Sequence, residues 1–234
     1  MSKTIARADP VARDAARIFD EMQRGGMAIL PLDVAYAVVG TTAEAIRTIF
    51  ATKRRSFEKP SGMFATWELS RDLHVMAEEH HAIGRVIVEE YALPFSIVAA
   101  YREDHPMLRG IDPFVLQTST KAGTLDMLIN AGRYHDAVAN VAISRGTAVF
   151  GSSANRSLTG SKFRFEDIEP EVKDAAAIAI DGGTAKYANP DGKSSTIIDF
   201  RDFTLIRRGV CCDQLEAIFR NHFGIVLRDP ATAH

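Results

Sequence analysis

Short apolar segments and amphipathic segments alternate along most of this chain, and that order limits the folds open to it. Residues 10–23 carry apolar side chains at helical spacing behind Asp9, a candidate N-cap, and Pro10. Residues 27–40 form an apolar run that Pro31 interrupts, which predicts two strand segments. Helical and strand-like segments then intermix without a strict strand–helix–strand repeat. The pattern therefore predicts an α/β fold with a mixed sheet and flanking helices, rather than a doubly wound parallel sheet.

The size and charge of the chain limit its class further. Its 234 residues, 46% of them hydrophobic, are enough for one large core. We therefore expect one domain over residues 1–210 and a C-terminal helix and tail over residues 211–234. The 28 Lys and Arg residues face 30 Asp and Glu residues, so no overall positive field would attract nucleic acid. Any anion-binding site must be local.

Cellular location is predicted from two further features. Residues 1–23 lack the apolar core of a signal peptide, and no run of ~18 apolar residues could span a membrane. The two cysteines, Cys211 and Cys212, are adjacent, a spacing that suits neither a usual disulfide nor a zinc site. We expect a cytoplasmic protein without a membrane partner.

A cationic stretch, TKRRSFEKPSGMF at residues 52–64, lies between a predicted helix and a predicted strand. Cations at a helix C-terminus complement the helix dipole, so a solvated charged face is one interpretation. Arginine is a planar partner for phosphate and lysine a point charge, so Lys53 and Arg55 could instead hold one polyanion. The stretch alone leaves both interpretations open.

A polar segment, GSSANRSLTGS at residues 151–161, directly follows a predicted strand. Its composition is typical of an ordinary turn, but small hydroxyls and exposed backbone N–H groups at the end of a strand also suit an anion. It has neither the GxxxxGK[ST] nor the GxGxxG pattern of common nucleotide-binding loops. No GxSxG elbow is present, so we expect no catalytic nucleophile there. The adjacent His80 and His81 lack metal-site spacing, and we expect no protein-held metal.

Taken in order, these segments resemble the YrdC-like family of threonylcarbamoyl-AMP synthases. The resemblance rests on ILPLDVAYAVVG, KRRSFEKP, LPFSIV, GSSANRS, SSTIIDF and LIRRG, which follow the family patterns PT[DE]TVYGLG, KxRPxxKP, GPxT, TSANxSG, STIVD and LRxG. It spans roughly residues 10–210. No single motif is specific, but their common order is. The family implies a twisted, open α/β sheet with a concave, basic cleft.

The resemblance also implies a chemistry. ATP lies in the cleft while bicarbonate and L-threonine combine to a carbamate, which attacks the α-phosphate and expels pyrophosphate in the pathway that modifies tRNA with threonylcarbamoyladenosine. Such a transfer needs positioning and charge neutralisation, with Mg²⁺ on the phosphates, and no side-chain nucleophile. The nucleotide-binding residues implied in this way are Lys53, Arg55, Lys59, Ser153, Asn155 and Arg207.

The departures from the family gather where the amino acid is held. Leu32 and Val34 replace threonines of PT[DE]T, Phe64 takes the place of a histidine, and Asn130 is the nearest residue to the arginine of a VRVP stretch. Unpartnered polar groups are costly to desolvate, about 1–3 kcal/mol each, so an apolar site suits threonine poorly. We expect a different, smaller or more apolar carboxylate or amine co-substrate. The acceptor-binding residues expected are Leu32, Val34, Phe64, Asn130, Ser152 and Ser195.

Three functions compete at this stage. The first is an ATP-dependent nucleotidyltransferase of the threonylcarbamoyladenylate type, and the second is a related enzyme that forms another carbamoyl or acyl adenylate. The third is a module that binds tRNA or double-stranded RNA, which the basic cleft of the family would suit. Against the third stands the net charge of −2, because phosphate-driven affinity grows with the number of phosphates neutralised.

Overall fold

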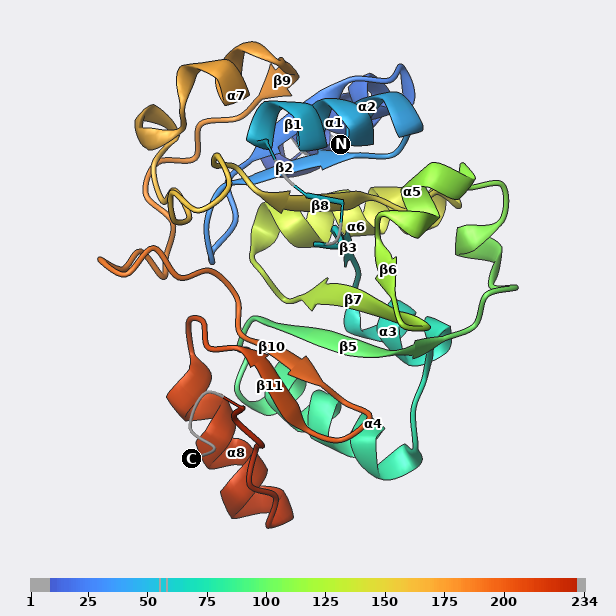
Figure 1. Ribbon diagram of the computed structural model, residues 1–234, viewed down its shortest axis with the longest axis vertical. Helices are drawn as coiled ribbons and strands as arrows, with labels where there is room; N and C mark the ends of the chain where they lie inside the picture. Colours follow the sequence, from blue (N-terminus) through green and yellow to red (C-terminus); the bar gives the residue numbers. More distant parts are fainter. Residues whose placement is uncertain (1–8, 55, 58, 231–234) are drawn as a thin grey trace, which may run out of the picture.

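The computed structural model describes residues 9–54, 56–57 and 59–230, and most of its strands belong to one large sheet (Figure 1). The strands are β1 (Met27–Leu30), β2 (Ala37–Gly40), β3 (Gly62–Phe64), β4 (His74–Val75), β5 (Phe95–Tyr101), β6 (Thr120–Lys121), β7 (Thr124–Ile129), β8 (Phe150–Ser153), β9 (Ala176–Ala179), β10 (Ile197–Asp199) and β11 (Thr204–Arg207). The strand order is β11-β10-β5-β7-β3-β8-β2-β1-β9, with β4 added to β5 and β6 to β7.

The sheet is mixed and open. Three of its pairs are parallel (β1 with β9, β3 with β7, β5 with β10) and the other pairs are antiparallel. Its path ends at β9 on one side and β11 on the other, so the sheet does not close into a barrel. The predicted α/β class with a mixed sheet and flanking helices is confirmed.

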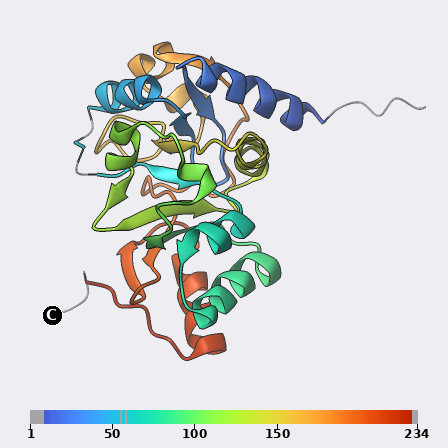
Figure 2. The same ribbon diagram turned by 90° about the vertical axis from the view of Figure 1, so that its right-hand side faces the viewer.

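Helices cover both faces of the sheet. The α-helices are α1 (Pro10–Gln23), α2 (Ala43–Lys53), α3 (Trp67–Leu73), α4 (Glu78–Arg85), α5 (Pro113–Gln117), α6 (Arg133–Ser144), α7 (Pro170–Asp174) and α8 (Cys212–Phe223). Short 3₁₀ turns at Pro106–Leu108 and Phe165–Asp167, and a π-helical turn at Val86–Glu90, complete the helical segments. In both views α1 and α8 lie at opposite ends of the molecule (Figures 1 and 2).

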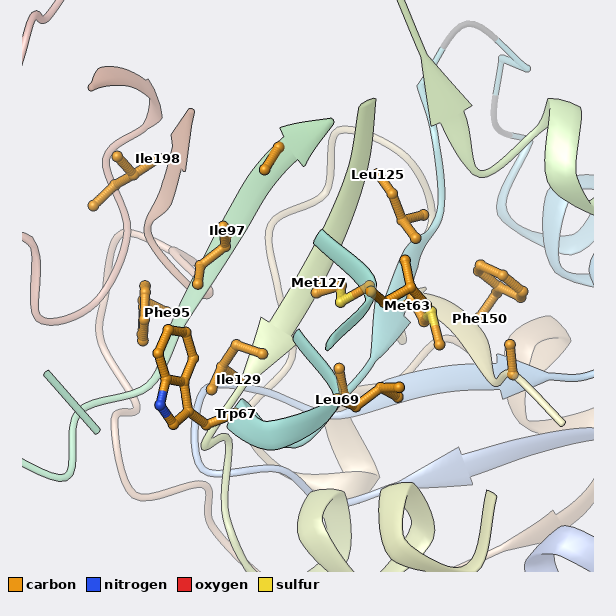
Figure 3. Packing of buried hydrophobic residues seen from close by; sticks show 14 of the residues in the cluster. Met63, Trp67, Leu69, Phe95, Ile97, Leu125, Met127, Ile129, Phe150 and Ile198 are labelled. Carbon is orange, nitrogen blue, oxygen red and sulfur yellow. The ribbon is translucent and has the colours of Figure 1, made fainter. Parts of the chain in front are cut away.

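The larger core lies on one face of the sheet, where alternate strand residues meet α2, α3, α4, α5, α7 and α8. A row of directly paired residues crosses this face, and all of them are fully buried. The row consists of Phe150, Met63, Met127, Ile97 and Ile198. Figure 3 shows these side chains together with Trp67 and Leu69 of α3. We refer to the row as the closed row.

The smaller core lies on the opposite face, under α1 and α6. The predicted start of α1 is confirmed, because the Asp9 side chain accepts from the Val11 N–H at 3.1 Å and Pro10 is the first helical residue. The helix α2 begins after Thr42, its N-cap, and the Thr41 hydroxyl donates to the Met22 carbonyl at the end of α1.

The helix α8 is integrated into the larger core. Its Phe219 ring packs edge-on against Phe200 and Phe203, with ring centroids 5.9 and 5.5 Å apart. Leu215 and Ile218 are buried in the same cluster. The helix therefore covers the β10–β11 end of the sheet, while the boundary at residue 210 stays a prediction.

Candidate functional site

A cavity of ≈ 130 Å³ lies on the sheet face that also carries α1 and α6. Its walls come from β3, β5, β7, β8, β10 and β11, and from the segment that joins β1 to β2. The lining residues are Leu32, Val34, Ala35, Tyr36, Ala37, Pro60, Gly62, Phe64, Ser96, Asp126, Leu128, Gly151, Ser152, Ser153, Ser194, Ser195, Ile197 and Arg207. Five serines, one arginine and one aspartate thus surround an otherwise apolar floor.

The strand register places a second row of residues across the cavity. Arg207 pairs with Ile197, Ile197 with Ser96, Ser96 with Leu128, and Leu128 with Phe64. Opposite partners on neighbouring strands project to the same face, so the row runs from a cation at one end to an aromatic ring at the other. We refer to it as the cavity row. Five strands from distant parts of the sequence are needed to build it.

Arg207 is held in place at the cationic end. Its Nε and Nη2 donate to the Ser195 carbonyl at 3.0 and 2.8 Å, and Nη2 also donates to the Ser195 hydroxyl at 2.9 Å. Arg207 is an exposed residue, but the protein around it partly desolvates its guanidinium. This desolvation lowers the pKa of the guanidinium. The carboxylate of Asp126 opposes that shift. The arginine remains cationic, since a guanidinium is not deprotonated in proteins.

Lys53 lies beneath the cavity rather than in its wall. It is the last residue of α2, only 2% exposed, and its ammonium donates to the carbonyls of Ser153 and Asn155 and, at 3.4 Å, to the Asn155 side-chain oxygen. Its own carbonyl accepts from the Ser157 N–H at 2.9 Å. In this structure the expected phosphate ligand therefore holds the loop after β8 in position.

Ser153 and Asn155 form the polar edge of that loop. The Ser153 hydroxyl donates to the Asn155 side-chain oxygen at 2.5 Å, and the Asn155 amide donates to the Arg156 carbonyl at 2.5 Å. Asn155 is buried, whereas Ser153 lines the cavity. Asn155 thus orients Ser153, and Ser153 is the one of the two that a ligand in the cavity would meet.

The remaining cations of the KRR stretch contribute differently. Arg55 lies outside the described residues, so its predicted role is not tested. Lys59 is exposed on the loop before β3, next to Pro60, which lines the cavity. Lys59 therefore stands near the mouth, where a large anion would reach it from outside.

Most of the expected acceptor residues are brought together. Leu32, Val34 and Phe64 are 4, 1 and 3% exposed and form the apolar floor. The Phe64 ring packs on the buried His135, with ring centroids 4.8 Å apart. Ser152 and Ser195 also line the cavity.

Asn130 is not part of the cavity. It has a left-handed backbone, with φ of 53°, and its amide donates to the Leu93 carbonyl at 3.3 Å. A strand exposes every second residue to one face, and β7 presents Asp126 and Leu128 to the cavity. The residue of this segment that faces a ligand is therefore Leu128, two positions before Asn130.

Sequence reasoning missed Asp126, Leu128, Ser96 and Ser194 as cavity residues. No strand was expected at β7, although it lies in the middle of the sheet. The signal was present in Leu125, Met127 and Ile129, whose period of two marks a strand with Asp126 and Leu128 on its other face. The described part of the chain holds no group of three or more His, Cys, Asp or Glu that could hold a metal ion.

Comparisons with known proteins support the fold. No family model and no curated protein sequence matches the chain. Among solved structures, the hypothetical protein smu.1377c of Streptococcus mutans UA159 is similar with a TM-score of 0.71 and 18% identity, over 91% of this chain and 93% of that one. P. abyssi Sua5 in complex with L-threonine has a TM-score of 0.70 and 18% identity, over 94% of this chain and 58% of Sua5.

A third similar structure is E. coli YciO, with a TM-score of 0.62 and 16% identity over 86% of this chain and 92% of YciO. At these identities the likeness concerns the fold and carries no residue roles.

Within the described residues, no helix is both long and apolar enough to cross a membrane. The chain has the YrdC-like fold: an open, mixed sheet with helices on both faces, and a cavity on the face that α1 and α6 share.

Proposed function

We propose that the chain is an ATP-dependent nucleotidyltransferase of the threonylcarbamoyladenylate type with an altered co-substrate site. Bicarbonate and the amino group of a small co-substrate combine, with loss of water, to a carbamate. A carbamate oxygen then bonds to the α-phosphorus of ATP, the bond from that phosphorus to the oxygen of the β-phosphate breaks, and pyrophosphate leaves. The product is a carbamoyl-type adenylate.

The observation that carries this proposal is the convergence of Arg207 with the hydroxyls of Ser153 and Ser195 in one cavity. A fixed guanidinium and preorganised hydroxyls suit the charge that develops on a transferred phosphoryl group. No side-chain nucleophile is needed, because positioning and charge neutralisation supply most of the catalysis.

The size of the cavity supports different places for the two substrates. Its ≈ 130 Å³ is close to the volume that holds benzene, about 150 Å³, so it encloses a molecule of about six heavy atoms. A nucleoside triphosphate is much larger and would lie across the mouth, near Arg207, Ser153 and Lys59. The co-substrate would then occupy the floor, beside Leu32, Val34 and Phe64.

Mg²⁺ would enter with ATP. It usually keeps several waters and binds through substrate phosphates and one or two carboxylates. Asp126 is the one carboxylate among the cavity-lining residues that the structure describes. The residues that line the cavity therefore suit a Mg²⁺ ion bound to the phosphates of ATP, and they do not form a complete binding site of their own for the ion.

Titration calorimetry with ATP and Mg²⁺ tests the nucleotide site. We expect Arg207→Gln to weaken ATP binding about 10- to 100-fold, because it removes a charged donor to phosphate. Arg85→Gln, which removes an exposed arginine of α4, is the matched control and should bind ATP normally. Equal affinity of Arg207→Gln and wild type would contradict the proposal.

The reaction is tested by pyrophosphate release from ATP with bicarbonate and a panel of amines and amino acids. Tight binding and fast turnover of L-threonine would remove the altered co-substrate site from the proposal.

An RNA partner stays a prediction, and among the described cavity residues Arg207 is the single cation. RNA binding would fall steeply with salt, whereas binding of one ATP should fall less.

A further inference from the structure

Asp126 gives the cavity a negative charge that sequence reasoning did not anticipate. It lies on β7 two residues before Leu128, and both residues line the cavity. Its field reaches Arg207, where it opposes the desolvation that lowers the pKa of the guanidinium. A carboxylate on a central strand is costly to desolvate, so a functional reason is expected for it.

The opposite strand makes room for this carboxylate. Gly62 of β3 also lines the cavity, and a Cβ atom placed on it would lie 3.3 Å from Oδ2 of Asp126. Glycine in a strand weakens it and often marks a place where another group approaches closely. The pair of Gly62 and Asp126 therefore keeps a carboxylate in the cavity wall at some cost to the sheet.

The surroundings of Asp126 suit a cation and disfavour an anion. Leu128, two residues further along β7, and Phe64, its partner on β3, offer no donor to a ligand carboxylate. The donors of the cavity are the serine hydroxyls and Arg207. The fixed guanidinium, Arg207, stands at the far end of the cavity row, on the side assigned above to the nucleotide phosphates. A co-substrate carboxylate on the floor would face Asp126 and be repelled.

We propose that the co-substrate is a small primary amine with an apolar body and no carboxylate, and that Asp126 is the residue that selects it. The amino group lies against Asp126, and the apolar body lies on Leu32, Val34 and Phe64. This assignment rests on the function proposed above, because it uses the cavity that the nucleotide covers.

Three probes with the same apolar body test it: isobutylamine, isobutyrate and L-valine, which is isobutylamine with a carboxylate added. Binding is measured by titration calorimetry on the full chain, with and without ATP and Mg²⁺. We expect isobutylamine to bind at least about tenfold more tightly than L-valine or isobutyrate, since a charged hydrogen bond is gained and a repulsion avoided. With bicarbonate and ATP, isobutylamine should also release pyrophosphate fastest.

Asp126→Asn keeps the shape and removes the charge, so it should lose about tenfold in isobutylamine affinity and keep its ATP affinity. Asp191→Asn, at an exposed aspartate paired with Lys193, is the control. If Asp126→Asn does not fold, as judged by its melting curve, Gly62→Ala replaces it and should weaken the amine by crowding Oδ2.

Three results would overturn the assignment. The first is L-valine or isobutyrate binding as well as isobutylamine, or no probe binding at about 10 mM, the weak end of specific affinity. The second is unchanged amine affinity in Asp126→Asn. The third is a loss confined to Mg²⁺–ATP, which would make Asp126 a metal ligand. Failure of wild type to bind ATP would instead reject the proposed function, and amine binding without ATP would still be measured.

Discussion

The closed row and the cavity row lie one residue apart on the same strands, yet they have opposite characters. On β3, β7 and β5 the closed row presents Met63, Met127 and Ile97, all fully buried under helices. The cavity row presents the next residues, Phe64, Leu128 and Ser96, to a hollow that also holds Asp126 and Arg207. The register of these strands therefore determines both which residues form the larger core and which residues line the cavity.

Substitutions on one face of the sheet should therefore change stability, and substitutions on the other face should change binding, even where both lie on the same strand. A change on the closed row removes packing and leaves the cavity groups in place. A change on the cavity row removes a ligand contact and leaves the larger core intact. The strand β8 offers the sharpest comparison, because Phe150 and Ser153 lie on one short segment.

The largest effect is expected from Phe150→Ala on the closed row. Phe150 is fully buried, and truncating a buried phenylalanine costs about 3–5 kcal/mol of unfolding free energy. Urea denaturation followed by circular dichroism measures it. A loss below about 1 kcal/mol would show that this face is less tightly packed than the structure indicates.

Lys53→Met should affect both stability and binding. It removes the ammonium that bonds to the Ser153 and Asn155 carbonyls and leaves these acceptors short of a donor, at a cost of about 1–3 kcal/mol. We expect a lower melting temperature together with weaker ATP binding. Weaker ATP binding at an unchanged melting temperature would instead identify Lys53 as a direct phosphate ligand.

Low pH should weaken the closed face through His74. Its ring is 1% exposed, contacts Ser70 and the Leu125 carbonyl, and burial lowers its pKa from 6.5 to about 4. The unfolded chain takes up a proton below pH 6.5 and the folded chain only near pH 4, so stability falls as pH falls through this window. From pH 7 to pH 5 the loss is about 2 kcal/mol.

Urea denaturation at both pH values measures this loss in wild type and in His74→Gln. The variant lacks the titrating ring, so its stability should change less between the two pH values. Equal changes in both proteins would assign the pH effect to other groups.

The smallest effect is expected from Ser153→Ala on the cavity side of β8. The hydroxyl bonds to Asn155 and is only partly buried, so unfolding free energy should fall by about 0.5–1.5 kcal/mol. ATP affinity should fall by a similar free energy, as measured by calorimetry. A stability loss as large as that of Phe150→Ala would break the separation by face.

Local patterns were enough to predict the fold class, and the family resemblance pointed to most of the cavity floor. Apolar periodicity predicted α1, because burial of one face determines that segment, and a C-terminal helix was expected where α8 lies. Leu32, Val34 and Phe64 were expected to act together, and all three line the cavity.

What the sequence did not reveal depends on long-range pairing. The strand β7 carries a polar residue at its centre and was missed, since only its position between β3 and β5 explains Asp126. Lys53 looked like a free cation because its partners lie 100 and 102 positions later. Asn130 was expected in the site as the nearest residue to a family arginine, and the sequence did not reveal the register of β7, which presents Leu128 instead.

The cavity row also sets the order in which a newly made chain can become competent to bind. The Ser96 and Ser195 hydroxyls lie 3.4 Å apart across β5 and β10, although 99 positions separate them in the chain. Arg207 follows later still, on β11. During synthesis, the edge of β5 that pairs with β10 therefore stays unpaired until β10 has been made. An unpaired strand edge favours aggregation, and the wide sequence separation prolongs this exposure. A ribosome-bound chain that ends before residue 197 would carry the apolar floor without the cationic wall.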